Sequence, residues 1–342
     1  MLKYNRTYKL NIGDTIDSIS KKFSLDSKDI ISYHNTYCNL KNIILYDIPS
    51  NVKEITLPPL GVEVKDGKIV DLDKKQKVII PSPEQDSINI KKLNHTYGVI
   101  IKRESIEKNV LQLHYEIHIK YLNTIQQKYY EIELDRKQVY INNKAPDLVA
   151  EELSDQLGNV LYPVRVLITK KGDIIDVTNA KEINRRWKNK REKIARYYQS
   201  SLVAKLLVKM DKAYASKDSI LTALQNNIFL NIYFLYLHKP NSNFKKNYKK
   251  KMSTSPFGEK HSYKITNDLE PFLTDTKKIK YRITGAIEDT TIQSKLDFIF
   301  KLESSNSIVF MIEGTIYTEK ENKKEKVILQ AYNLDIKKNR HE

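Results

Sequence analysis

A strand, a tight turn and a helix follow one another near the start of the chain, and they constrain its fold more than any other segment. Tyr8 and Leu10 alternate with polar neighbours, which is typical of a half-buried strand. Gly13 permits a tight turn, and Asp14 or Thr15 can accept backbone N–H bonds at the start of a helix. Small and apolar residues then recur at helical spacing: Ile16, Ile19, Ser20 and Phe23.

The next segment predicts a second helix and a closing strand. The helix is expected between Ser27 and Asn35, with Ile30 and Ile31 on its inner face. Residues 55–57 alternate and are expected to pair with the first strand. We expect the Asn35 side chain to bond the backbone across the turn, so its role is interpreted as structural.

This order of parts over residues 4–60 resembles a LysM domain, of the kind without a signal peptide that is found in contractile injection and type VI secretion-associated proteins. The resemblance implies a βααβ module that binds N-acetylglucosamine chains, as in peptidoglycan or chitin, through the turn after the first strand and the loop before the second. Asn51 and Val52 replace the usual Gly-Gln of that loop. The implied contact residues are Gly13, Asp14, Thr15, Ile16, Ile48, Pro49, Asn51 and Val52.

Composition indicates a globular protein of ordinary polarity, and the resemblance implies a bacterial one. With 342 residues, 40% of them hydrophobic, the chain can form two or three domains that each bury a core. A single cysteine, Cys38, excludes an internal disulfide framework. The most apolar run, residues 228–237, is too short to span a bilayer.

The first residues and the net charge bear on location and partners. Residues 1–6 lead directly into the first predicted strand without an apolar signal core, so we expect a cytoplasmic protein that is exported, if at all, by a non-classical or injection route. The net charge of +17 is mostly lysine. It is interpreted as solvated lysine faces, or alternatively as attraction to DNA, an acidic protein or anionic lipid.

The rest of the chain predicts an α+β domain. Residues 61–93 are interpreted as a linker, with a hairpin at Asp66-Gly67 and a tether at Pro81-Ser82-Pro83. Residues 94–342 are expected to form an antiparallel sheet packed against a helical segment at about 179–226. Residues 229–237 are predicted to be a strand, and residues 239–251, with six lysines and no acid, a mobile loop.

The helical segment carries a concentrated positive charge. Residues 181–212 hold eleven basic and three acidic side chains, a net charge of +8. One hypothesis is a solvated basic face on a helix that packs Ile183, Trp187, Ile194 and Tyr198 against the sheet. The alternatives are an acidic protein partner and, less favoured, nucleic acid. The candidate partner surface consists of Arg185, Arg186, Lys190, Arg191 and Lys193.

Motifs for catalysis are scarce. The sequence holds no Walker loop, Rossmann glycine fingerprint or nucleophile elbow. His114, Glu116 and His118 fall on one face of a predicted strand, where a polar, exposed face is favoured over a metal site. Cys38 has only His34 nearby as a base, in a module too small for a pocket. We therefore expect no enzyme activity, catalytic residue, metal or cofactor.

Three functions fit these observations. The first is a non-enzymatic adaptor or structural component of a contractile injection apparatus, phage-tail-like or type VI, that contacts spike, hub or baseplate subunits or loads cargo. The second is a cell-wall protein that binds peptidoglycan or another N-acetylglucosamine polymer. The third is an injected effector whose activity the sequence does not identify.

Overall fold

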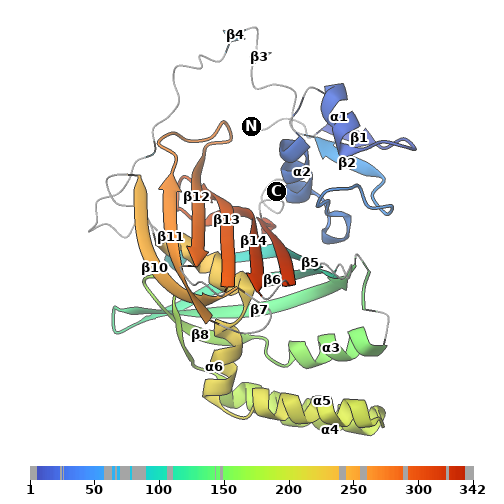
Figure 1. Ribbon diagram of the computed structural model, residues 1–342, viewed down its shortest axis with the longest axis vertical. Helices are drawn as coiled ribbons and strands as arrows, with labels where there is room; N and C mark the ends of the chain where they lie inside the picture. Colours follow the sequence, from blue (N-terminus) through green and yellow to red (C-terminus); the bar gives the residue numbers. More distant parts are fainter. Residues whose placement is uncertain are drawn as a thin grey trace. The chain divides into compact units, whose positions relative to one another are not determined.

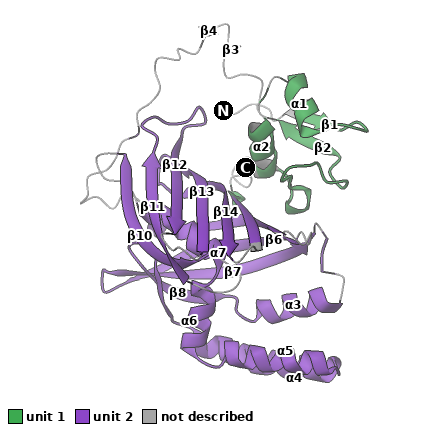
Figure 2. Ribbon diagram, viewed as in Figure 1, with its two compact units in different colours: residues 1–76, 332–342 green, residues 77–331 purple. Residues whose placement is uncertain are grey.

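The computed structural model divides the chain into two compact units (Figure 2), residues 1–76 with 332–342 and residues 77–331. Helices and antiparallel strands are both abundant, so the fold class is α+β, as predicted. The structure describes residues 6–57 apart from 24 and 26, 64–65, 68–69, 78, 90–105, 111–146 apart from 143, 149–238, 244–254, 260–287, 292–320 and 323–335.

The first unit has the strand–helix–helix–strand order that its sequence predicts. Its two strands pair antiparallel, from Arg6 opposite Leu57 to Lys9 opposite Glu54. Ile19, Ile30 and Ile55 are fully or almost fully buried between the helices and this strand pair. The elements are β1 (Arg6–Lys9), α1 (Ile16–Phe23), α2 (Ser27–Tyr37), the 3-10 helix η1 (Leu40–Asn42) and β2 (Glu54–Leu57).

Two neighbouring side chains at the end of α2 join it to the rest of this unit. The amide of Asn35 donates to the carbonyl of Ile44 over 2.6 Å and accepts from the Ile44 N–H over 2.9 Å. This confirms the predicted structural role of Asn35. The His34 ring accepts from the Thr56 N–H at Nδ1, so its Nε2 donates to the Asn42 carbonyl. Both ring nitrogens thus bond the backbone, which leaves neither as a base for Cys38.

The linker is described only in part. Its predicted hairpin is present as β3 (Val64–Lys65) and β4 (Lys68–Ile69), which pair antiparallel. The predicted tether at Pro81-Ser82-Pro83 lies outside the described residues.

The second unit is built on one eleven-stranded sheet in the order β10-β11-β12-β13-β14-β15-β5-β6-β7-β8-β9. Two meanders, β10 to β15 and β5 to β9, lie side by side because β15 neighbours β5. Neighbouring strands are antiparallel from β10 to β14 and from β5 to β9. The strands are β5 (Asn94–Ser105), β6 (Leu111–Ile125), β7 (Tyr129–Ile141), β8 (Val164–Thr169), β9 (Ile174–Val177), β10 (Lys245–Ser253), β11 (Lys260–Leu269), β12 (Lys278–Ile287), β13 (Ile292–Glu303), β14 (Val309–Lys320) and β15 (Lys323–Asn333).

Helices α4 to α7 connect the end of one meander to the start of the other, and the sheet curves around α7 (Figure 1). Helices α4 and α5 contact each other and α6, and the pair lies apart from the sheet, whereas α6 contacts β9 and α7 contacts β10. The helices are α3 (Val149–Asn159), α4 (Ala180–Tyr197), α5 (Ser201–Ala213), α6 (Lys217–Gln225) and α7 (Ile228–Tyr233); the 3-10 helices are η3 (Ile90–Lys92) and η4 (Phe234–Leu237).

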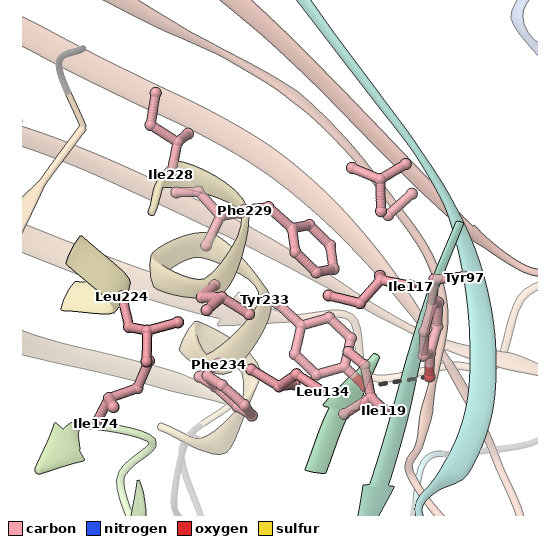
Figure 3. Packing of buried hydrophobic residues seen from close by; sticks show 14 of the residues in the cluster. Tyr97, Ile117, Ile119, Leu134, Ile174, Leu224, Ile228, Phe229, Tyr233 and Phe234 are labelled. Atoms are coloured by element: carbon pink, nitrogen blue, oxygen red, sulfur yellow. Dashed lines mark hydrogen bonds between the residues drawn. The ribbon is translucent and has the colours of Figure 1, made fainter. Parts of the chain in front are cut away.

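The strand predicted at residues 229–237 is wrong, because this run forms α7 and η4 inside the sheet. Phe229 and Tyr233 point from α7 toward Ile117 and other strand residues (Figure 3), and the Tyr233 hydroxyl donates to that of Tyr97 over 3.2 Å. A helix buried on all sides is apolar all round and lacks the usual polar face. Its sequence therefore matches that of a buried strand. Each fully buried apolar side chain contributes roughly 1.5–3 kcal/mol.

The mobile loop predicted at residues 239–251 is also wrong where the structure describes it, since residues 245–253 form β10. Lys245, Lys249 and Lys251 are exposed, while Lys250 and Met252 are buried. Exposed and buried side chains do alternate along this strand. Because lysines occupy both faces, the sequence shows no alternation of polar and apolar residues.

The alternation of residues 129–134 and that of residues 138–141 predict two short strands, but the structure has one strand, β7, across both. Gln138 has a φ of 41° and is the extra residue at a bulge, between Lys137 opposite Glu116 and Val139 opposite Tyr115. The bulge breaks the alternation along the sequence without ending the strand.

Among the described residues, no single helix combines the length and apolarity needed to cross a membrane; α6 and the α7–η4 segment do so only when taken together, and they are bent by 65°.

Candidate functional site

The two loops that the sequence proposes as a binding surface lie at the same end of the β1–β2 pair. Beyond Lys9 and Glu54, the Leu10 N–H donates to the Lys53 carbonyl over 3.0 Å, which extends the ladder by one bond. Because the strands are antiparallel, the turn after β1 and the loop before β2 both begin here. We call residues 10–15 and 46–53 the loop end of the first unit.

The turn after β1 is held by its own polar groups. The Asp14 carboxylate accepts from the Tyr8 hydroxyl and from the Asn11 N–H, each over 2.8 Å. The Asn11 N–H bond, followed by the Tyr8 bond, lowers the pKa of Asp14 below its ordinary value. Gly13 has a φ of +88°, a conformation that favours glycine, and the position of its missing Cβ is open space. Asp14 is therefore used to shape the turn.

The helix start is fixed by Thr15. Its hydroxyl accepts from the Ser18 N–H over 3.1 Å, and the Ser18 hydroxyl accepts from the Thr15 N–H over 3.0 Å. This reciprocal pair is a capping box, and it identifies Thr15, rather than Asp14, as the N-cap of α1. On the facing loop, Asn51 donates to the Lys41 carbonyl over 2.6 Å.

Exposure separates the eight implied contact residues. Ile16 and Val52 are buried in the core, so their side chains do not reach a ligand. Gly13, Thr15 and Asn51 are exposed; Asp14, Ile48 and Pro49 are half-buried. Two exposed apolar residues complete the surface, Ile12 in the turn and Tyr46 in the loop. The sequence interpretation missed Ile12, although an isoleucine beside a turn glycine was the signal that could have identified it.

The basic residues predicted on α4 fall into two groups. Arg185 and Lys193 are exposed and Lys190 is half-exposed. Arg186 instead donates to the carbonyls of residues 161, 162 and 163, over 2.8–3.2 Å. Arg191 donates from Nε to the Asp211 carboxylate over 2.7 Å. The structure therefore brings only three of the five to a free surface.

The apolar face of α4 is buried as predicted, but its packing partners differ from the prediction. Ile183, Trp187 and Ile194 are buried, and Tyr198 is half-buried. The helix contacts α5 and α6 rather than lying on the sheet. The Trp187 indole N–H donates to Asp211 over 2.9 Å, and its ring lies 5.4 Å from that of Tyr214.

The polar face predicted at His114, Glu116 and His118 is not an exposed one throughout. His114 is fully buried, and burial lowers its pKa to about 4. His118 bonds Thr96 and Asn94 through its two ring nitrogens, over 3.1 Å and 3.0 Å. Within the described part of the chain, no group of three or more His, Cys, Asp or Glu side chains is arranged to hold a metal ion.

One polar cluster of the second unit, in which Lys250 and His238 are buried and Asp173 is exposed, was not predicted. The Lys250 ammonium lies 2.6 Å from the Asp173 carboxylate and 3.4 Å from Nε2 of His238. The His238 ring is stacked on Tyr248 at 4.2 Å. Burial, with Lys250 adding to it, lowers the pKa of His238 to about 3, so the ring is neutral. The ion pair between Lys250 and Asp173 joins β10 to the turn before β9.

No protein-family model matches the chain, and no curated protein matches it.

Proposed function

We propose that this protein is a non-enzymatic adaptor that binds a protein partner through the loop end of its first unit. The partner we propose is a spike, hub or baseplate subunit of a contractile injection apparatus, or its cargo. The resemblance of residues 4–60 to LysM domains supports this class of partner.

The observation that carries the proposal is the loop end itself. Ile12 and Tyr46 are large apolar side chains exposed on loops, whereas the neighbouring polar groups of Asp14, Thr15 and Asn51 are engaged within the unit. A sugar polymer is bound by polar groups and aromatic rings together. A surface on which two large apolar side chains are exposed, while these three polar groups are engaged, favours a protein partner.

The test is partner recovery from the native host after gentle crosslinking, with the tagged full chain. The Ile12→Ser/Tyr46→Ser variant changes only exposed side chains and is expected to fold. Recovery of apparatus subunits with the wild type, and their loss with the variant, supports the proposal. Recovery of wall fragments alone, or micromolar binding of N-acetylglucosamine oligomers lost in the same variant, contradicts it and assigns the loop end to glycan.

A further inference from the structure

We propose that the α4–α5 hairpin docks the protein on an anionic lipid bilayer. This inference concerns the second unit and is independent of the proposed partner of the loop end. It accounts for a concentration of exposed lysines and exposed apolar side chains; of the latter, Tyr197 also lies edge-on to the Tyr198 ring at 4.7 Å.

The charge of the hairpin is largely uncompensated. Its acidic residues are Glu182, Glu192 and Asp211; Asp211 pairs with Arg191, and Glu182 lies 3.9 Å from Arg165. Among the ion pairs of the described residues, none joins an acid to the remaining exposed or half-exposed basic side chains of the hairpin. These are Lys181, Arg185, Lys188, Lys190, Lys193, Arg196, Lys205, Lys209 and Lys212.

Apolar side chains are exposed among these cations. Tyr197 at the end of α4 is 80% exposed and Leu202 at the start of α5 is 75% exposed, so both lie at the tip of the hairpin. Val208, two turns further along α5, is 52% exposed. Leu202, Lys205, Val208, Lys209 and Lys212 share the outer arc of α5, because Val203 and Leu207 face the core.

The chemistry of these residues favours a bilayer over other anionic partners. Seven of the nine uncompensated cations are lysines, whose flexible, hydrated point charges suit a diffuse negative surface. Arginine forks suit fixed carboxylate or phosphate geometry, and the structure uses two of the hairpin's four, Arg186 and Arg191, internally. Tyrosine and leucine at the tip fit the boundary between headgroups and acyl chains.

The test is co-sedimentation of the full chain with phosphatidylcholine vesicles, with and without phosphatidylglycerol. We expect binding only to the vesicles that contain phosphatidylglycerol. The Lys205→Gln/Lys209→Gln/Lys212→Gln variant is expected to bind roughly 100-fold more weakly. The matched control, Lys128→Gln/Lys144→Gln/Lys295→Gln, removes the same charge from exposed lysines elsewhere and is expected to bind as the wild type does.

A second variant separates the bilayer from other polyanions. Tyr197→Ser/Leu202→Ser keeps every charge, and it is expected to lose roughly tenfold in vesicle affinity at raised salt, where charge attraction is screened and apolar insertion remains. Equal binding by this variant overturns the proposal. So does tighter binding to a DNA duplex or to polyglutamate than to the anionic vesicles, and so does an equal loss in the control lysine variant. Partner capture by the loop end is expected to be unchanged in all three variants.

Discussion

Lys250 and Asp173 join the two edges of the eleven-stranded sheet through a contact of 2.6 Å between Nζ and Oδ1. Lys250 lies in β10, the strand at one edge, and Asp173 in the turn that precedes β9, the strand at the other. The Lys250 side chain is 8% exposed and that of Asp173 is 48% exposed. The pair thus holds the curved sheet around α7 at a place where its edge strands do not pair.

We predict that the two halves of this pair differ in their effect on stability. Asp173→Asn leaves a buried ammonium without its counter-charge and is expected to lower the free energy of unfolding by about 3 kcal/mol. Lys250→Met leaves a half-exposed carboxylate that water can solvate, so the expected loss is about 1 kcal/mol. Denaturant unfolding of both variants measures the difference. Equal losses, or a larger one for Lys250→Met, contradict this account of the pair.

Stability is predicted to fall on mild acidification because of two buried histidines. His238 and His114 have pKa values of about 3 and about 4 in the fold, both lowered chiefly by burial, whereas an unfolded histidine titrates near 6.5. Between pH 6 and 4, roughly, the unfolded chain binds protons that the folded chain does not, so the fold loses about 1.4 kcal/mol per pH unit for each histidine.

The carboxylate of Asp173 adds to this loss at lower pH. Burial alone raises its pKa, but the hydrogen bond and charge of Lys250 outweigh burial and leave the pKa below its ordinary value. Its contribution is therefore present above the unfolded pKa and is lost as pH falls through the folded one. Denaturant unfolding across this range measures the slope. An unchanged slope in the His238→Gln/His114→Gln variant contradicts the histidine assignment.

Adjacent arginines on α4 are predicted to behave differently. Arg186→Gln removes bonds to three backbone carbonyls and is expected to lower the free energy of unfolding by about 2–3 kcal/mol. Arg185→Gln removes the same charge from an exposed side chain, with an expected effect below about 0.5 kcal/mol. Thermal unfolding compares them directly. An Arg186→Gln protein as stable as the wild type would contradict this account, because it would mean that the three carbonyl bonds do not stabilise the fold.

Asn35 is predicted to be needed for the first unit. Asn35→Ala leaves the N–H and carbonyl of Ile44 without their partner in a buried site, at an expected cost of about 2–3 kcal/mol. Asn51→Ala removes an exposed bond and is expected to cost below about 1 kcal/mol. Exchange of the Ile44 amide hydrogen measures the local effect. We expect faster exchange of that amide in Asn35→Ala than in Asn51→Ala. Equal protection in both variants would contradict the role given to Asn35.

The parts of this fold that the sequence predicts are those with regular local patterns. The helices α4 to α6 lie within the helical segment expected at about 179–226, which follows from caps and helical spacing. α7 could not be distinguished from a strand, because a fully buried helix has no polar face. The burial of Lys250 was hidden as well, since its partner Asp173 lies 77 positions away in the sequence.

The position of the candidate site could be predicted from the sequence, but the exposure of its individual side chains could not. Turn and cap residues such as Gly13 and Thr15 have local signatures, and the antiparallel pairing of two strands brings their loops together. Which side chains remain exposed depends on the packed structure. Arg186 was a candidate by residue type, but it donates to carbonyls 23 to 25 positions away in the sequence, which no local pattern specifies.

Photo-crosslinking at the loop end tests the adaptor proposal most directly. A photoreactive amino acid at position 12 or position 46 of the full chain, in its native host, is compared with one at exposed position 128 in the turn between β6 and β7. The account predicts one and the same apparatus protein crosslinked from positions 12 and 46, and its absence from position 128. Wall glycan at both loop positions, or the same products from all three positions, would contradict it.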